Sequence, residues 1–164
     1  MNKQEFIESY KMSSFPMGVL IRMAPKDKLN WKPTDKSWTL GQLLHHCSGT
    51  PSVFQRVIDN SWPSREEMNQ SMTNSLSVQQ KDGETAAKDF ESAVNKVVEK
   101  LGQITETDYN NKPASTPWGI TGSLGKVLQG AADHQNTHKT ELYIYLKLLG
   151  LPVNTGTLYI GKSF

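Results

Sequence analysis

The amino-acid sequence predicts an all-α protein built as a four-helix bundle. Four segments of the 164-residue chain place apolar residues at alternating spacings of three and four, which is typical of helices that bury one face. Strand-like alternation is scarce, and long polar segments separate the middle helices. Such long links favour crossover connections over tight hairpins. The length predicts one domain, residues 1–164, ending in a tail from about residue 151 to 164.

The first helical segment carries an apolar seam that ends before Pro25. Its members are Phe6, Tyr10, Ser13, Met17, Leu20 and Ala24. Pro16 lies inside this segment and is expected to kink the helix or divide it near Phe15, because proline removes one backbone hydrogen bond and crowds the preceding turn.

The second segment starts after Ser37 or Thr39, either of which can act as the N-cap. Its apolar positions are Leu40, Leu43, Leu44, Cys47, Phe54, Val57 and Ile58. The tripeptide at residues 49–51, Gly-Thr-Pro, predicts a local bend. Residues 61–83 are polar and are expected to form a long connection with one short helical turn.

The third and fourth helices have clearer boundaries. Asp82 is the expected cap of the third, whose seam is Ala87, Phe90, Val94, Val97 and Leu101. Residues 102–120 contain two prolines and two glycines and predict a second crossover loop. The fourth helix is expected to begin at residues 121–123 and to end at Leu149, before Gly150. The tail segment 157–160 is expected to be short and extended.

Composition excludes several classes of protein. Eighteen basic and sixteen acidic residues give a formal charge of +2, too small to argue for nucleic acid or an anionic membrane surface as a partner. A single cysteine cannot form an intramolecular disulfide. No signal peptide or membrane span is apparent, so a cytoplasmic protein is expected. The Walker, GxGxxG, HExxH, GxSxG and CxxC motifs are absent.

Two histidines interrupt the apolar seam of the fourth helix. The full seam is Leu124, Val127, Ala131, His134, His138, Leu142, Tyr145 and Leu149. His134 and His138 are four residues apart and therefore lie one turn apart on one face. Their nitrogens need partners, which hydrogen bonds within the core, a catalytic base pair or a metal ion can each supply. The spacing is that of a two-histidine metal arm.

A third histidine lies on the inward line of the second helix. His46 shares that line with Leu43, Thr50 and Val53, whereas His45 points about 100° away. If the second and fourth helices are neighbours, His46, His134 and His138 form a three-histidine metal site with an open position. Imidazole ligands suit a divalent ion, with zinc or nickel expected first and iron, manganese or copper as alternatives.

Three neighbouring residues have other expected roles. Cys47 is expected to be a small buried apolar residue and not a ligand. Asp133 and Glu141 flank the histidine pair, and either can accept the second N–H of a ligating histidine or simply face solvent.

Four short motifs together give the chain a resemblance to the DinB/YfiT-like superfamily of metal-dependent four-helix-bundle proteins. They are DKLNWKP at residues 27–33, SWTLGQLLHH at 37–46, HQNTHKTEL at 134–142 and YLKLLG at 145–150. Their order and spacing cover roughly residues 3 to 153.

This resemblance implies an up-up-down-down bundle, a metal held by His46, His134 and His138, and a homodimer. It implies no nucleic-acid role. Characterised relatives include thiol S-transferases and isomerases that use low-molecular-weight thiols such as bacillithiol or mycothiol, while many others have no assigned reaction.

The expected function is therefore that of a metal-dependent transferase that acts on a small-molecule substrate with a low-molecular-weight thiol. The metal would lower the pKa of the thiol, so that the nucleophilic thiolate is present at neutral pH. A metal-dependent hydrolase is one alternative, and a non-catalytic metal-binding or dimerisation module is another. No motif identifies a catalytic residue; Glu141 is the one candidate considered for a base.

Overall fold

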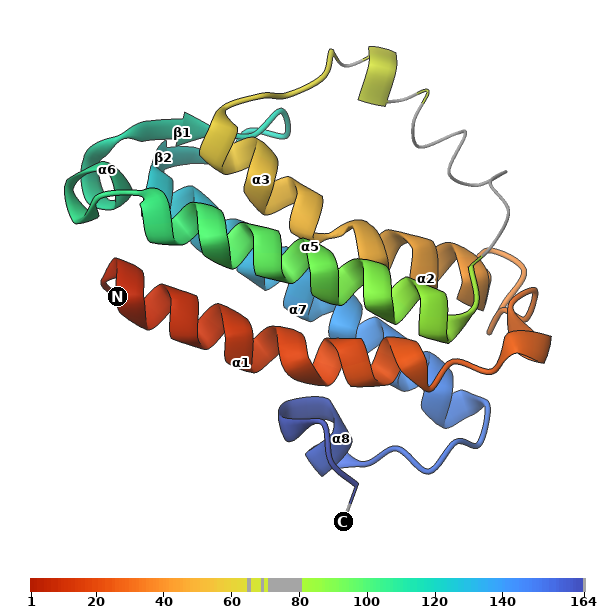
Figure 1. Cartoon of the computed structure of the whole chain (residues 1–164). Helices are drawn as coiled ribbons and strands as arrows, with labels where there is room; N and C mark the ends of the chain where they lie inside the picture. The colour runs from red at the N-terminus through yellow and green to blue at the C-terminus, as the bar shows by residue number, and fades with distance from the viewer. Residues whose placement is uncertain (65, 69, 71–80, 164) are drawn as a thin grey trace.

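The computed structural model describes residues 1–64, 66–68, 70 and 81–163 and confirms the all-α four-helix bundle (Figure 1). The long helical units are α1 (Lys3–Arg22), the pair α2 (Leu40–Gly49) and α3 (Pro51–Asp59), α5 (Gly83–Gln103) and α7 (Leu124–Leu148). The smaller elements are η1 (Lys26–Lys28), α6 (Glu106–Asn111), β1 (Pro113–Ser115), β2 (Thr121–Ser123) and α8 (Thr155–Ile160). Within the described ranges, no helix is both long enough and apolar enough to cross a membrane.

The helix directions are up, down, down, up, so the expected up-up-down-down order is wrong. Arg22 near the end of α1 pairs with Glu84 at the start of α5 at 2.9 Å, so these helices are antiparallel. Asp59 at the end of α3 pairs with Lys100 near the end of α5 at 2.5 Å, so these helices are parallel. Figure 1 shows α7 starting at the same end of the bundle as α1 and running in the same direction.

The link between α1 and α2 explains this order. The backbone N–H groups of Leu40 and Gly41 donate to the carbonyls of Trp31 and Leu29, at 2.8 Å each. These bonds hold the start of α2 beside the end of α1, so α2 runs back along the bundle in the direction opposite to α1. The end of α3 and the start of α5 instead lie at opposite ends of the bundle, because these two helices are parallel.

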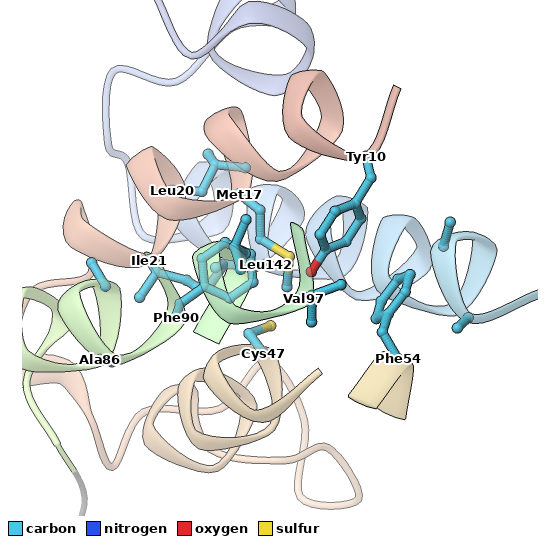
Figure 2. Packing of buried hydrophobic residues seen from close by; sticks show 14 of the residues in the cluster. Tyr10, Met17, Leu20, Ile21, Cys47, Phe54, Ala86, Phe90, Val97 and Leu142 are labelled. Atoms are coloured by element: carbon cyan, nitrogen blue, oxygen red, sulfur yellow. The ribbon is translucent and has the colours of Figure 1, made fainter. Parts of the chain in front are cut away.

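The four units surround one core. The α2–α3 unit packs against both α5 and α7, as α1 does, so α1 and the α2–α3 unit lie on one diagonal. Figure 2 shows side chains from all these helices meeting in the interior, including Tyr10, Cys47, Phe90 and Leu142.

Pro16 does not divide α1, which runs as one helix from Lys3 to Arg22. Buried side chains lie on both sides of the proline, with Tyr10 at 1% and Met17 at 0% exposure. Burial of this face outweighs the one backbone hydrogen bond that proline removes. The buried serine of this face is Ser14, not the expected Ser13.

The expected bend in the second segment is confirmed as a break between two helices. Thr39 is the N-cap of α2, and its hydroxyl and the Gln42 side chain form a reciprocal capping box. Thr50 ends α2 and Pro51 begins α3, since proline fits the first turn of a helix but not its interior.

Residues 102–120 contain more structure than the expected loop. Thr105 caps α6 by accepting from the N–H of Asp108, and buried Tyr109 fixes this short helix to the core. β1 and β2 then pair antiparallel, with Ala114 opposite Gly122. Short strands rich in proline and glycine resemble a loop in sequence, and only their pairing identifies them.

The tail is helical, so the expectation of an extended segment at 157–160 is wrong. Asn154 and Thr157 form a reciprocal capping box at the start of α8, and Gly161 ends it with a φ of 69°. The apolar run at 158–160 suggested a strand, but these local caps select a helix. α8 packs against α1 and α7.

About half of the connection expected across residues 61–83 lies outside the described residues. Within it, residues 66–68 and 70 are helical, which agrees with the one short helical turn expected there. At the start of the connection, the Trp62 indole N–H donates to the carbonyl of Ser115 at 2.9 Å, and its ring meets Trp118 edge-on. Trp62 therefore packs on the β1–β2 hairpin.

Gly83→Ala should destabilise the protein by about 1–3 kcal/mol, because a Cβ at this position overpacks a rigid contact. The added carbon would lie 2.6 Å from the carbonyl oxygen of Ile21 and 3.0 Å from that of Ala24, where α5 begins against the end of α1. Urea unfolding measures the effect. Gly102→Ala in the same helix is the control, since a Cβ there meets nothing within 4 Å. It should leave stability unchanged or raise it by up to about 1 kcal/mol; equal losses in both variants would contradict the close approach at Gly83.

Candidate metal centre

The structure brings together the three histidines predicted from the sequence. His134 and His138 lie one turn apart on α7, and His46 faces them from α2, which packs antiparallel against α7. Each ring contributes one nitrogen to a group of three nitrogens that all lie within 4.8 Å of one another. The ring centroids are 4.2 Å apart for His46 and His138, 4.6 Å for His134 and His138, and 5.5 Å for His46 and His134.

Burial keeps two of the three rings neutral. Desolvation, and then the repulsion of the other histidines, lowers the pKa of His46 to about 4. Desolvation and His138 also lower the pKa of His134. At neutral pH both rings are therefore uncharged, which is the state in which an imidazole nitrogen can bind a metal.

One nitrogen in the cluster has no hydrogen-bond partner among the described residues. Nε2 of His46 is buried and makes no hydrogen bond. Leaving a buried polar atom unpaired costs about 1–3 kcal/mol. A metal ion between the three rings would satisfy this nitrogen, so the residues present fit a bound cation.

Glu141 orients one ring of the cluster. Its Oε2 lies 2.9 Å from Nδ1 of His138. Because a carboxylate accepts hydrogen bonds, Nδ1 carries the proton and Nε2 is left free to bind a metal. Asp133, the other candidate, is exposed and instead accepts from Gln129 at 3.3 Å.

Trp38 also packs against the cluster, although sequence reasoning did not assign it to the site. Its ring lies 5.1 Å from that of His46 and is nearly parallel to that of His138, at 6.1 Å and 14°. Its carbonyl accepts from the hydroxyl of Tyr145 at 3.1 Å, and Trp31 packs edge-on against Tyr145. Trp38 lies just before the N-cap of α2 and so outside the helical spacing, which is why no periodic pattern in the sequence marks it as a neighbour of the histidines.

Cys47 and His45 stand apart from the cluster, as expected. Cys47 is fully buried, and burial raises the pKa of its thiol well above the ordinary value, with the charge of Glu141 adding to the effect. It remains a neutral thiol whose Sγ lies 3.8 Å from the carbonyl of His138. His45 is half-buried and does not join the group.

Three imidazoles on two helices form an incomplete coordination shell. Within the described part of the chain, no fourth histidine, cysteine or carboxylate joins the group. Structural zinc sites have four protein ligands, whereas catalytic sites keep one position for water or substrate. The geometry is therefore that of a site open to an exogenous ligand.

Comparisons with known proteins identify the same kind of fold. A sequence profile of the DinB superfamily matches residues 19–142. A DinB-like protein of Bacillus cereus ATCC 10987 has 18% identity and a TM-score of 0.75, covering 94% of this chain and 98% of that one. The DinB-like protein YjoA of Bacillus subtilis has 21% identity and a TM-score of 0.65, covering 91% and 96%. A protein of Exiguobacterium sibiricum 255-15, described as belonging to the DinB family, has 18% identity and a TM-score of 0.68, covering 96% and 98%. No curated protein sequence matches the chain.

Replacing any histidine of the cluster with alanine should abolish tight metal binding, because two nitrogens cannot hold the ion as three do. We expect about one equivalent of zinc or nickel in untagged wild-type protein after reconstitution, and a small fraction of this in His46→Ala and His138→Ala. Elemental analysis after dialysis measures it. His45→Ala, next to His46 but outside the cluster, should retain the wild-type content; an unchanged content in His138→Ala would refute the site.

Glu141→Ala should weaken metal affinity by about 10- to 100-fold without abolishing binding, because it frees the His138 ring to rotate and to change tautomer. Competition with a chromogenic chelator measures the affinity. Asp133→Ala, also an acidic residue on α7, is the matched control and should bind as wild type does. Equal affinities in all three proteins would mean that Glu141 does not orient the ligand.

Proposed function

This chain belongs to the DinB superfamily, and we propose that it is a metal-dependent enzyme, a transferase that joins a low-molecular-weight thiol to a small electrophilic substrate. His46, His134 and His138 are the proposed ligands, and zinc or nickel is the proposed ion, since imidazole-rich sites suit these metals. The near-neutral charge of the chain agrees with a small-molecule substrate.

The observation that carries the proposal is the unpartnered buried nitrogen of His46 beside two further imidazoles, those of His134 and His138. Hydrophobic side chains at these positions would avoid this unsatisfied polar atom. Arrangements that cost stability are expected at functional sites.

The chain's own residues have distinct roles in this reaction. The three histidines supply nitrogen donors and leave one position free for the thiol. Glu141 holds the proton on Nδ1 of His138 and so keeps Nε2 directed at the ion. A bound divalent ion supplies Lewis acidity, lowering the pKa of the thiol or, in a hydrolytic alternative, of water that reaches its free position.

Trp38 forms one wall of the site in this proposal. Its indole lies against His46 and His138, and its backbone is tied to α7 through Tyr145. A large apolar ring at this place shields two ligands from water. The thiol and the electrophile would then approach beside it.

Metal-loaded protein should catalyse conjugation of a model electrophile with at least one thiol from a panel of cysteine, glutathione, bacillithiol and mycothiol. The untagged protein is stripped with a chelator, reloaded with zinc or nickel, and assayed for loss of free thiol. Rates should fall at least 100-fold in the stripped protein and in His138→Ala, because both lack the group that generates thiolate.

His45→Ala is the control and should retain the wild-type rate. Turnover that is equal in stripped and loaded protein would refute metal dependence. Metal-dependent ester hydrolysis without any thiol conjugation would instead support the hydrolase. Metal-loaded protein that is inactive in both assays would support the third alternative, a non-catalytic metal-binding module.

A further inference from the structure

A cavity lies on the other side of α7 from the histidines, between α1, α7 and α8. Its volume is about 610 Å³, within the range of small-molecule sites. Its polar and apolar lining includes Glu5, Glu8, Met12, Asn136, Lys139 and Tyr159. Lys139 directly follows His138, so helical geometry turns it about 100° away from the metal centre. Figure 1 shows α8 lying against α1 where it closes this side of the bundle.

Lys139 is a buried cation without a counter-ion among the described residues. The residue is only 8% exposed, and it forms no hydrogen bond or ion pair with any described residue. An unpaired charge at such a depth is costly, and buried lysines are almost always paired. A ligand with an anionic group would supply the missing partner.

The α7 wall contains a second polar group that the described protein leaves unsatisfied. Oδ1 of Asn136 is buried and accepts no hydrogen bond. Asn136 precedes Lys139 by three residues, so both side chains lie on the same face of α7. Two adjacent unsatisfied groups at a cavity indicate a place built for polar contact with something outside the chain.

The opposite wall, on α1, carries negative charge. Glu5 and Glu8 line the cavity, and neither pairs with a basic side chain in the described part of the chain. Glu5 accepts from the backbone N–H of Asn2, and Glu8 accepts from the amide of Gln4. A simple anion bound at Lys139 would be repelled by these carboxylates, and a simple cation bound at them would be repelled by Lys139.

Apolar surface completes the lining. Met12 on α1 and Tyr159 on α8 are 74% and 67% exposed, and Leu158 lies beside them. Exposed apolar side chains of this size at a cavity favour a ligand with an apolar part.

We propose that this cavity binds a small zwitterion, an α-amino acid with an apolar side chain, whose carboxylate meets Lys139 and whose ammonium group meets Glu8. The two charges of the ligand match the two walls, and its side chain contacts Met12 and Tyr159. This site is separate from the metal centre, so the proposal does not depend on the proposed transferase activity.

Leucine and two analogues test the zwitterion directly. Isothermal titration of the full-length protein should show saturable binding of leucine, methionine or phenylalanine. For leucine, removal of either charged group should weaken binding at least tenfold, as measured with 4-methylpentanoate, which lacks the ammonium group, and 3-methylbutylamine, which lacks the carboxylate. No saturable binding of any of the three amino acids overturns the site, and equal affinity for 4-methylpentanoate and leucine overturns the zwitterion.

Lys139→Met separates binding from structure, because methionine keeps most of the length and removes only the charge. We expect at least a tenfold loss of amino-acid affinity together with a thermal midpoint raised by a few degrees, since the buried unpaired ammonium is gone. Glu8→Gln should weaken the binding of leucine but not the binding of 4-methylpentanoate. Lys147→Met, an exposed lysine on the same helix, should leave both quantities unchanged. A Lys139→Met variant that binds leucine as wild type does, or that unfolds at a lower temperature, overturns the proposal.

Discussion

The antiparallel packing of α2 against α7 is the constraint on which the candidate site depends. It is held by a hydrogen-bonded amide in the middle of the core. Gln135, only 1% exposed, accepts from the hydroxyl of Thr50 at 3.2 Å and donates to the hydroxyl of Ser14 at 3.0 Å. A shift of any of these helices would leave buried polar atoms unpaired, so this network defines their register. His134 lies next to Gln135 and His46 one turn before Thr50, and the same register therefore places their rings opposite each other.

The apolar core around the histidines also determines their chemistry. Desolvation keeps His46 and His134 uncharged, and it keeps the neighbouring Cys47 a neutral thiol. The same burial therefore prepares the rings of His46 and His134 as metal ligands and removes the thiol as a competitor. The unsatisfied Nε2 of His46 is the structural cost of this arrangement, because no described protein group reaches it.

α7 divides two chemically different sites. One side presents the imidazoles of His134 and His138 to α2, and the next residue along the chain, Lys139, faces α1 and α8. The 3.6-residue period makes this possible, since successive side chains point about 100° apart. Each side carries a buried polar group that no described protein atom satisfies: Nε2 of His46 faces one side of α7, and Oδ1 of Asn136 lies on the other.

The sequence by itself determined the helices, most of their ends and the inward direction of three histidines. These features depend on contacts within a few residues: the spacing of apolar side chains, the caps at Thr39 and Asp82, and the break at Pro51. Only the tertiary structure decided the up-down-down-up order, the place of Trp38 against the histidines and the isolation of Lys139. These depend on which helices become neighbours, and that depends on links such as residues 23–39, whose backbone hydrogen bonds leave no periodic pattern in the sequence. The same distinction explains the short elements, because a hairpin is defined by pairing between strands, whereas periodicity records only the burial of one element.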